Sequence, residues 1–279
     1  MDYPGAWPSP AEAPPASRAL ALLRRRGASL AHHLLPRCCA LCSLPLDDPA
    51  ERRLGWCGPC AASLPGVDAE RCPVCAQRDP AGALLPGASS MLAVPAPGLP
   101  CQACRNAPPP YERTVALADY APPLDRLILA LKFGHAVSLA GPLGAALAAR
   151  IDFALDLVLP IPLSAQRLAE RGFNQAWLIT RAIAGARGGA ATRGKTPAHD
   201  AGVLTRVRHD PPQSLQPLRE RAANLRGAFS CQRDLTGLRV ALVNDVMTSG
   251  ATLAEAARTA RNAGAEFVAT IVAARTPRD

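Results

Sequence analysis

The segment Val240–Thr252, with the sequence Val-Ala-Leu-Val-Asn-Asp-Val-Met-Thr-Ser-Gly-Ala-Thr, constrains the fold of this chain more than any other stretch. It begins with an apolar run rich in branched residues, which is typical of a central parallel strand covered on both faces. Residues Leu253–Ala263 then favour an amphipathic helix, and Gly264 is placed to end it. The order of strand, small-residue turn and helix predicts an α/β sheet with the turn at a helix N-terminus.

The predicted turn has the composition of an anion-binding loop. Unpaired backbone N–H groups and the positive end of the helix dipole converge at a helix N-terminus. The loop residues are Thr248, Ser249, Gly250, Ala251 and Thr252, which combine a glycine that allows close approach with hydroxyl donors. Asp245 ends the strand, where open α/β sheets bind ligands, and its carboxylate can accept from two adjacent ribose hydroxyls. The segment therefore predicts a sugar-phosphate site.

The same segment resembles the 5-phosphoribosyl pyrophosphate (PRPP) signature of type I phosphoribosyltransferases. That signature is an apolar strand, two acids, two apolar residues and a small hydroxyl-rich loop. The first acid of the usual pair is Asn244 here, which can bond a hydroxyl but carries no charge. Part of the electrostatic support for a cationic sugar and for magnesium is therefore missing. A generic strand, turn and helix with an aspartate at the strand tip is the alternative interpretation.

A second apolar run, Leu157–Leu163, predicts another buried strand that breaks at two prolines. The string Arg-Gly-Phe-Asn-Gln follows at residues 171–175. With Leu131–Phe133 upstream and Arg206, Gln213, Arg221, Asn224, Gly227 and Phe229 downstream, the chain resembles the ComF family of competence-associated proteins from about Cys39 to the C-terminus. The resemblance implies a type I phosphoribosyltransferase-like domain, in which helices flank a parallel sheet, preceded by a small cysteine-rich zinc-ribbon module.

The resemblance also implies roles for the residues around this second strand. In the family's fold the turn that follows the strand faces pyrophosphate, and here it is Pro160, Ile161, Pro162, Leu163 and Ser164. Arg167 and Arg171 are four residues apart, so on a helix they share a face and can clamp phosphate oxygens. A solvated helix face is the alternative for both arginines. Lys132 is either a point charge for the site or an ordinary helix-end cation.

The segment between Ala190 and Arg226 is polar and rich in proline. Long loops of this kind inside a compact domain are usually functional or disordered. We interpret it as a lid that closes over the sugar phosphate and excludes water, with Arg206, Gln213 and Arg221 as candidate lid residues.

Four C-x-x-C pairs precede residue 105, and two such pairs can hold one tetrahedral zinc ion. The pairs are Cys39 and Cys42, Cys57 and Cys60, Cys72 and Cys75, and Cys101 and Cys104. A disulfide scaffold is the competing account, but no secretory signal is recognisable and a reducing cytoplasm fits better. The simple order, with the first two pairs on one ion and the last two on another, resembles the family's double zinc ribbon. Spacing alone leaves the pairing open.

The chain of 279 residues is long enough for two folded units. We predict a disordered or helical leader at residues 1–36, a double zinc ribbon at 37–106 and a phosphoribosyltransferase-like domain at 111–279. No apolar run approaches membrane-spanning length, so a cytoplasmic location is expected. The sequence does not specify the oligomeric state, and a homodimer is one possibility that it leaves open.

The formal net charge of +9 invites a nucleic-acid partner, but the scarcity of aromatic residues, 4%, argues against a base-stacking platform. Trp56 beside Cys57 can stack on a base, although core packing is the commoner role. The first functional hypothesis is a PRPP- and magnesium-dependent phosphoribosyltransferase acting on an unidentified nitrogen nucleophile, with Asp245 and Arg171 as catalytic residues. The alternative is a non-catalytic PRPP-sensing accessory protein of competence that contacts single-stranded DNA or a helicase.

Overall fold

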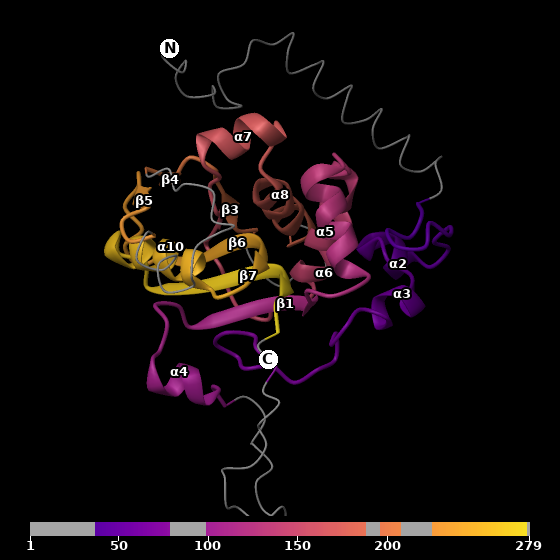
Figure 1. The fold of residues 1–279 in the computed structure, drawn as a ribbon, viewed down its shortest axis with the longest axis horizontal. Helices are drawn as coiled ribbons and strands as arrows, with labels where there is room; N and C mark the ends of the chain where they lie inside the picture. Colours follow the sequence, from indigo (N-terminus) through magenta and orange to yellow (C-terminus); the bar gives the residue numbers. More distant parts are fainter. Residues whose placement is uncertain (1–36, 79–98, 188–195, 208–224, 278–279) are drawn as a thin grey trace, which may run out of the picture.

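The computed structural model describes residues 37–78, 99–187, 196–207 and 225–277 (Figure 1). Its helices are α2 (Pro49–Leu54), α3 (Gly58–Ala62), α4 (Gln102–Asn106), α5 (Leu124–Phe133), η1 (Val137–Leu139), α6 (Ala140–Ala148), α7 (Ala165–Arg171), α8 (Gln175–Arg187) and α10 (Ala251–Asn262). Its strands are β1 (Arg113–Asp119), β2 (Leu157–Pro160), β3 (Ala198–His199), β4 (Leu204–Arg206), β5 (Phe229–Cys231), β6 (Arg239–Met247) and β7 (Phe267–Arg275).

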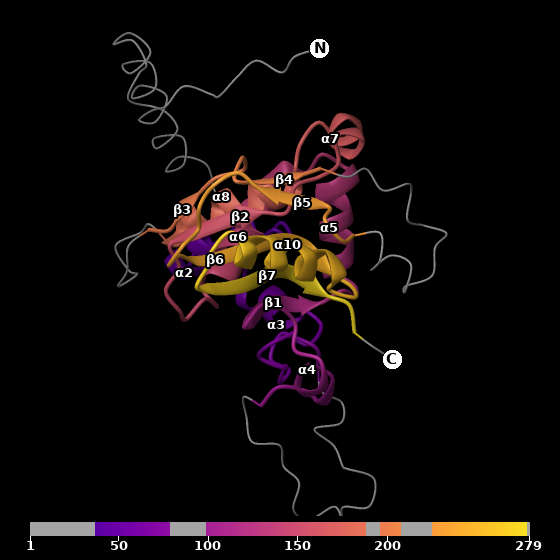
Figure 2. The ribbon, with the colours of Figure 1, turned by 90° about the vertical axis from the view of Figure 1, so that its left-hand side faces the viewer.

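A five-stranded parallel sheet in the order β1, β7, β6, β2, β3 forms the centre of the fold. Alternate residues of β6 enter different cores because successive side chains of a strand point to opposite faces. Ala241 and Val243 pack in the core that contains α5, α6 and α8, whereas Val240 and Leu242 pack in the core that contains α10 (Figure 2). The predicted fold class, a parallel sheet flanked by helices after a cysteine-rich region, is confirmed.

Helix α10 begins at Ala251, two residues before the predicted start at Leu253. Gly250 adopts a left-handed conformation with φ of 84° as the N-cap, which lets the chain turn from strand into helix early. Gly264, with φ of 95°, follows the helix, and a Cβ there would lie 2.9 Å from the Cα of Thr236. The prediction that Gly264 ends the helix is confirmed, and the close backbone approach adds a second reason for a glycine.

The cysteine-rich region covers the exposed edge of β1 (Figure 2). The N–H groups of Thr114 and Asp119 donate to the carbonyl oxygens of Pro73 and Pro65 at 3.0 Å and 2.8 Å. Trp56 is 3% exposed and donates through Nε1 to the carbonyl of Pro142 at 3.0 Å. Its predicted role in the core is therefore confirmed. Because an unpaired edge strand invites association with other chains, this cover also protects the sheet.

A buried carboxylate joins the cysteine-rich region to the sheet. Asp119 at the end of β1 forms an ion pair with Arg71 at 2.7 Å and also pairs with Arg78, and its side chain is 5% exposed. We expect Asp119→Asn to lower the free energy of unfolding by about 3–5 kcal/mol, because two guanidinium groups lose their counter-charge. Urea unfolding measures the change. Asp152→Asn, which breaks an exposed pair with Arg113, is the control and should alter stability little; equal effects of the two substitutions would contradict this role.

The segment between residues 190 and 226 is not one continuous loop. Strand β3 joins the sheet beside β2, and β4 pairs with β5 in a separate two-stranded antiparallel sheet. Residues 188–195 and 208–224 lie outside the described ranges. Among the helices of the described ranges, none combines the length and the apolar character that crossing a membrane requires.

Candidate phosphoribosyl site and metal centres

Asp245 lies near the carboxyl end of β6, and the residue is 4% exposed. One oxygen, Oδ1, accepts from the N–H of Val246 at 2.7 Å. The other, Oδ2, accepts from Gln175 Nε2 at 2.9 Å and forms an ion pair with Lys132 Nζ at 2.9 Å. A buried carboxylate is stable only when it is paired and hydrogen-bonded, and these three partners meet that requirement.

Asn244 and Asp245 point to opposite faces of β6. The Asn244 amide donates to the carbonyl of Val246 at 3.0 Å and lines the hollow inside the loop that follows the strand. Residues 246–253 form the rest of that lining, so the whole predicted loop Thr248–Thr252 surrounds it. Ser249 Oγ accepts from the N–H of Ala251 at 3.3 Å, which tightens the turn. The structure therefore places Asn244 with the loop, and Asp245 with α5 and α8.

Gly250 is required at the tip of this loop. Its φ is 84°, and a Cβ would lie 2.8 Å from Met247 Cε. We expect Gly250→Ala to weaken binding of a phosphate ester about tenfold, because both the strain and the contact shift the loop amides. Calorimetry with ribose 5-phosphate measures this. Gly185→Ala in α8, where the added Cβ meets nothing within 4 Å, is the matched control and should leave affinity unchanged.

Each residue of the string at positions 171–175 has a separate structural role. Arg171 ends α7, and its guanidinium carbon lies 5.0 Å from the centre of the Phe133 ring. Gly172 caps that helix with φ of 74°, and Phe173 meets His135 edge to face at 5.9 Å. The last two residues, Asn174 and Gln175, contact the candidate site directly.

Asn174 and Gln175 connect the two predicted ligand loops. Asn174 Nδ2 donates to the carbonyl of Ile161 at 3.0 Å, while its Oδ1 accepts from the N–H of Ala176 at the start of α8. Gln175 is 3% exposed and bonds Asp245. One dipeptide thus holds the turn after β2 and the carboxylate near the end of β6. The sequence pattern marked this string as a family signature but did not assign Gln175 to the site.

Two cations lie beside the carboxylate. Lys132, in the last turn of α5, makes the ion pair with Asp245, so its site role is favoured over that of an ordinary helix-end cation. Burial lowers the pKa of the Arg171 guanidinium, and the negative charge of Asp245 opposes that effect. Arg167 is exposed on α7 near Arg171. The carboxylate of Asp245 is therefore paired with a lysine and interacts electrostatically with an arginine.

The turn after β2 lies beside the end of β6. Pro160 is the last residue of β2, and the N–H of Ile161 donates to the carbonyl of Val243 at 2.9 Å. Ser164 caps α7 by accepting from the N–H of Arg167 at 3.3 Å. The five predicted pyrophosphate-loop residues, Pro160, Ile161, Pro162, Leu163 and Ser164, thus run from the sheet to the helix that bears Arg171.

The three lid candidates divide between described and undescribed residues. Arg206 ends β4 opposite Phe229 of β5, with its guanidinium carbon 5.6 Å from that ring. Gln213 and Arg221 lie outside the described residues. Arg206 is therefore part of a paired strand at the border of the undescribed segment 208–224.

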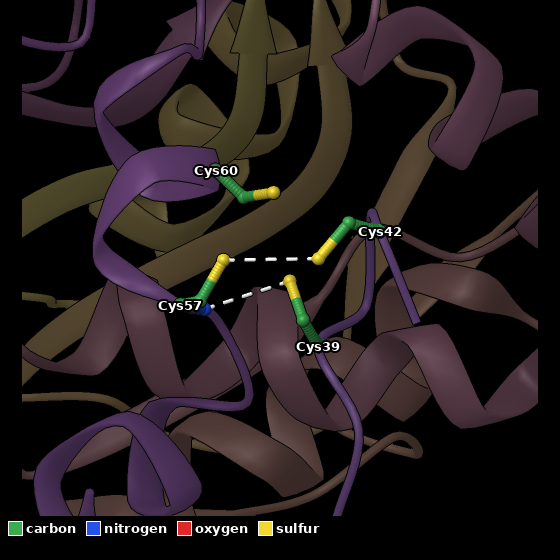
Figure 3. A group of neighbouring side chains, drawn as sticks. All are labelled: Cys39, Cys42, Cys57 and Cys60. Atoms are coloured by element: carbon green, nitrogen blue, oxygen red, sulfur yellow. Dashed lines mark hydrogen bonds between the residues drawn. The ribbon is translucent and has the colours of Figure 1, made fainter. Parts of the chain in front are cut away.

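The eight predicted cysteine ligands form two groups of four, in the simple order. The first cluster is Cys39, Cys42, Cys57 and Cys60 (Figure 3), and the second cluster is Cys72, Cys75, Cys101 and Cys104. In each cluster the sulfur atoms lie within 4.8 Å of one another. The Cys42–Cys57 and Cys75–Cys101 sulfur pairs are 3.8 Å and 3.7 Å apart. Tetrahedral zinc with Zn–S bonds of about 2.3 Å requires sulfur separations of about 3.8 Å, so the residues fit this ion.

Backbone N–H groups favour the thiolate form of one cysteine in each cluster, whereas the pKa values of Cys57, Cys60, Cys75 and Cys104 are raised. The N–H of Cys57 points to Cys39 Sγ at 3.5 Å, and the N–H of Cys101 points to Cys72 Sγ at 3.3 Å. Burial raises the pKa of Cys39, but several N–H donors outweigh it and lower the pKa to about 6. A hydrogen bond from Cys75, with backbone donors, lowers the pKa of Cys72 to about 4. Thiolates are the form that binds metal.

The fold and the two clusters define a class of protein: an α/β domain with a central parallel sheet, joined to a cysteine-rich region whose two four-cysteine clusters fit a metal ion. No family model matches the chain. The chain is 33% identical over 242 residues to DNA utilization protein YhgH of Salmonella typhimurium, covering 84% of this chain and 95% of that protein. The Escherichia coli K12 protein of the same name is 32% identical over the same length and coverage.

Competence protein F of Haemophilus influenzae is 28% identical over 179 residues, 60% of this chain and 75% of that protein. The chain therefore belongs to the ComF family, together with the YhgH proteins. A solved structure of glutamine PRPP amidotransferase from B. subtilis, complexed with ADP and GMP, aligns with 49% of this chain and 26% of that chain. Its identity of 23% and TM-score of 0.33 are too low to carry an argument.

Proposed function

We propose that this chain binds PRPP at the carboxyl ends of β6 and β2 and transfers or holds its 5-phosphoribosyl group, in a role linked to DNA utilization. The observation that carries the proposal is the buried Asp245 directly before a glycine-capped loop at the N-terminus of α10. A carboxylate next to an anion-binding loop matches a ligand with adjacent hydroxyls and a terminal phosphate. The names of the YhgH and Competence protein F relatives support the link to DNA.

In this proposal the ligand extends across three parts of the site. The 5′-phosphate is bound by the amides and hydroxyls of Thr248–Thr252, and Asn244 lines the same hollow. The ribose hydroxyls reach Asp245. The diphosphate lies over the turn Pro160–Ser164 and is held by Arg171, which suits bidentate contact with phosphate oxygens. The hydrogen bonds of Asn174 keep that turn fixed relative to Asp245.

Asp245 and Arg171 carry the proposed chemistry. Loss of diphosphate leaves positive charge on the anomeric carbon, and a fixed carboxylate beside the sugar stabilises that charge. Arg171 stabilises the negative charge that develops on the departing diphosphate. Lys132 neutralises Asp245 in the free protein and moves toward the phosphate oxygens when the ribose hydroxyls take its place. The acceptor is a nitrogen nucleophile.

Magnesium is best accounted for as part of the ligand. The carboxylate of Asp245 accepts two hydrogen bonds and pairs with Lys132, and Asn244 donates its amide to a backbone carbonyl. These side chains fit a direct magnesium ligand set poorly, whereas diphosphate oxygens suit this hard cation. We therefore propose that magnesium arrives with PRPP and supplies charge neutralisation for the leaving group.

A non-catalytic PRPP sensor is the second candidate function. The neutral Asn244 and the ion pair between Asp245 and Lys132 favour it, because both reduce the negative potential available to a cationic sugar. In this version the cysteine-rich region or the basic surface contacts single-stranded DNA or a helicase. The formal net charge of +9 supports an anionic partner.

Zinc in both clusters is proposed to be structural. Four thiolates complete a tetrahedral shell and leave no position for water, so the metal serves folding and not hydrolysis. We propose a double zinc ribbon at residues 37–106 and a phosphoribosyltransferase-like domain at residues 111–279, after a leader at 1–36. A cytoplasmic location suits free thiolates.

The proposal is tested by diphosphate release from PRPP and magnesium in the presence of a panel of nitrogen bases. Release that depends on one base supports the transferase. Saturable PRPP binding by calorimetry without release under any base supports the sensor. Absence of binding heat with zinc-loaded, folded protein contradicts both. Filter retention of single-stranded DNA, with and without a chelator, separately tests contact between the cysteine-rich region and nucleic acid.

A further inference from the structure

A buried arginine joins the second cysteine cluster to the loop Thr248–Thr252. Arg275 is the last residue of β7, lies opposite Met247 of β6 and is 1% exposed. Its Nε donates to the carbonyl of Cys75 at 2.9 Å. Its Nη1 donates to the carbonyl of Met247 at 2.7 Å and also bonds the carbonyl of Thr248. One guanidinium therefore holds the backbone of a metal ligand and the first residues of the loop.

The surroundings of Arg275 are hydrogen-bonded to the same two elements. The N–H of Thr276 donates to the Met247 carbonyl at 3.0 Å, and Gln77 Nε2 donates to the Thr276 carbonyl at 3.0 Å. Gln77 lies two residues after Cys75, and its carbonyl accepts from the N–H of Cys72 at 2.9 Å. The polar chain from the cysteine pair to the loop is thus continuous.

A cleft lies between the loop Thr248–Thr252 and the second cluster. Its volume is about 410 Å³, and its lining includes Cys75, Cys104, Tyr111, Gly250 and Arg275. A loop that backs onto a cleft depends on its few polar attachments for position, because the dispersion contacts of a filled core are missing. The guanidinium provides such an attachment across the cleft.

The first cluster has a different attachment. It reaches the α/β domain through Trp56, which bonds the carbonyl of Pro142 in α6, and through the close contact of Gly55 with Pro142. Both contacts lie in or beside the core that contains α5, α6 and α8. The two clusters therefore differ in what they position, although their ligand sets are identical.

We propose that Arg275 is a positioning residue that makes the geometry of the loop Thr248–Thr252 depend on metal in the second cluster, and not in the first. Metal fixes the backbone of the Cys72–Cys75 pair. Without it the Cys75 carbonyl is free to move, and a buried cation that loses an acceptor must reorient. The Met247 and Thr248 carbonyls follow, and the loop amides shift. That the loop's ligand is PRPP rests on the proposed function.

Amide hydrogen exchange of the full chain, read by mass spectrometry without any ligand, tests the link. Cys101→Ser in the second cluster should speed exchange across residues 248–252, while exchange in α8 stays unchanged. Cys42→Ser in the first cluster is the matched control and should leave residues 248–252 unchanged. Equal responses of the loop to the two substitutions, or no response to either, would overturn the proposal.

A variant of the arginine itself gives a second measurement. Arg275→Lys keeps the charge but loses the planar fork. The single ammonium group cannot bond the Cys75 carbonyl and the Met247 and Thr248 carbonyls in the arginine's geometry. We expect faster loop exchange, about tenfold weaker PRPP binding and an unchanged zinc content. Unchanged exchange in a folded Arg275→Lys chain contradicts the role. Because hydrogen exchange requires no ligand, failure of the natural chain to bind PRPP would reject the proposed function without deciding this inference. If Arg275→Lys does not fold, the comparison of Cys101→Ser with Cys42→Ser still decides it.

Discussion

Asp245→Asn should reduce PRPP-dependent diphosphate release by a hundredfold or more, on the order of other losses of fixed charge at a reacting centre. The amide keeps the shape of the side chain but removes the negative charge that the proposed function assigns to stabilising the anomeric carbon. It also leaves Lys132 without its counter-charge. The two measurements are the steady-state rate of release and the dissociation constant of PRPP by calorimetry.

A matched control separates this effect from a general loss of stability. Asp156 also accepts a backbone N–H, that of Arg239 at 2.9 Å, but at the opposite end of β6. Asp156→Asn should leave both release and binding within experimental error. If Asp245→Asn binds PRPP as well as the natural chain and turns over as fast, the site does not use this carboxylate and the proposed function is wrong. Loss of binding in a variant that keeps its unfolding midpoint supports it.

The fold was predictable where local chemistry and burial agree. The apolar run Val240–Val243 favoured a strand covered on both faces, and Gly264 marked the end of the following helix. The regular spacing of the cysteine pairs predicted two metal clusters, and the simple pairing order is the one that the structure shows. These features depend on residues close together in the chain.

The arrangement of the site was less predictable because it depends on contacts between distant elements. Lys132 forms an ion pair with Asp245 from 113 positions earlier in the chain (245 − 132), and Gln175 donates a hydrogen bond to it from 70 positions earlier (245 − 175). The signal was present in both cases: a scarce lysine at a helix end, and the last residue of the family string. Arg275, by contrast, was part of an apolar strand end with no distinguishing pattern, so only the packing of β7 between β1 and β6 reveals its position.

Metal removal is expected to have the second large effect, on stability. Structural zinc in small four-cysteine sites supplies about 10–16 kcal/mol of apparent binding free energy at neutral pH. The first cluster also supports the main core, because Trp56 and Leu64 of the cysteine-rich region belong to it. We therefore expect the double substitution Cys57→Ser with Cys60→Ser to lower the thermal midpoint by more than about 10 °C. Circular dichroism measures the midpoint, and a chromogenic chelator measures zinc per chain.

The natural chain should release two zinc ions, one for each cluster, and the double variant one. Cys231→Ser is the control, because Cys231 lies outside both clusters and its thiol donates to the carbonyl of Arg233 at 3.1 Å. It should keep both ions and the natural midpoint. A chain that contains no zinc, keeps its midpoint in chelator and loses it in reductant would instead indicate disulfides. In that case disulfides stabilise the cysteine-rich region that covers β1. The proposal that the loop Thr248–Thr252 depends on metal would then be wrong.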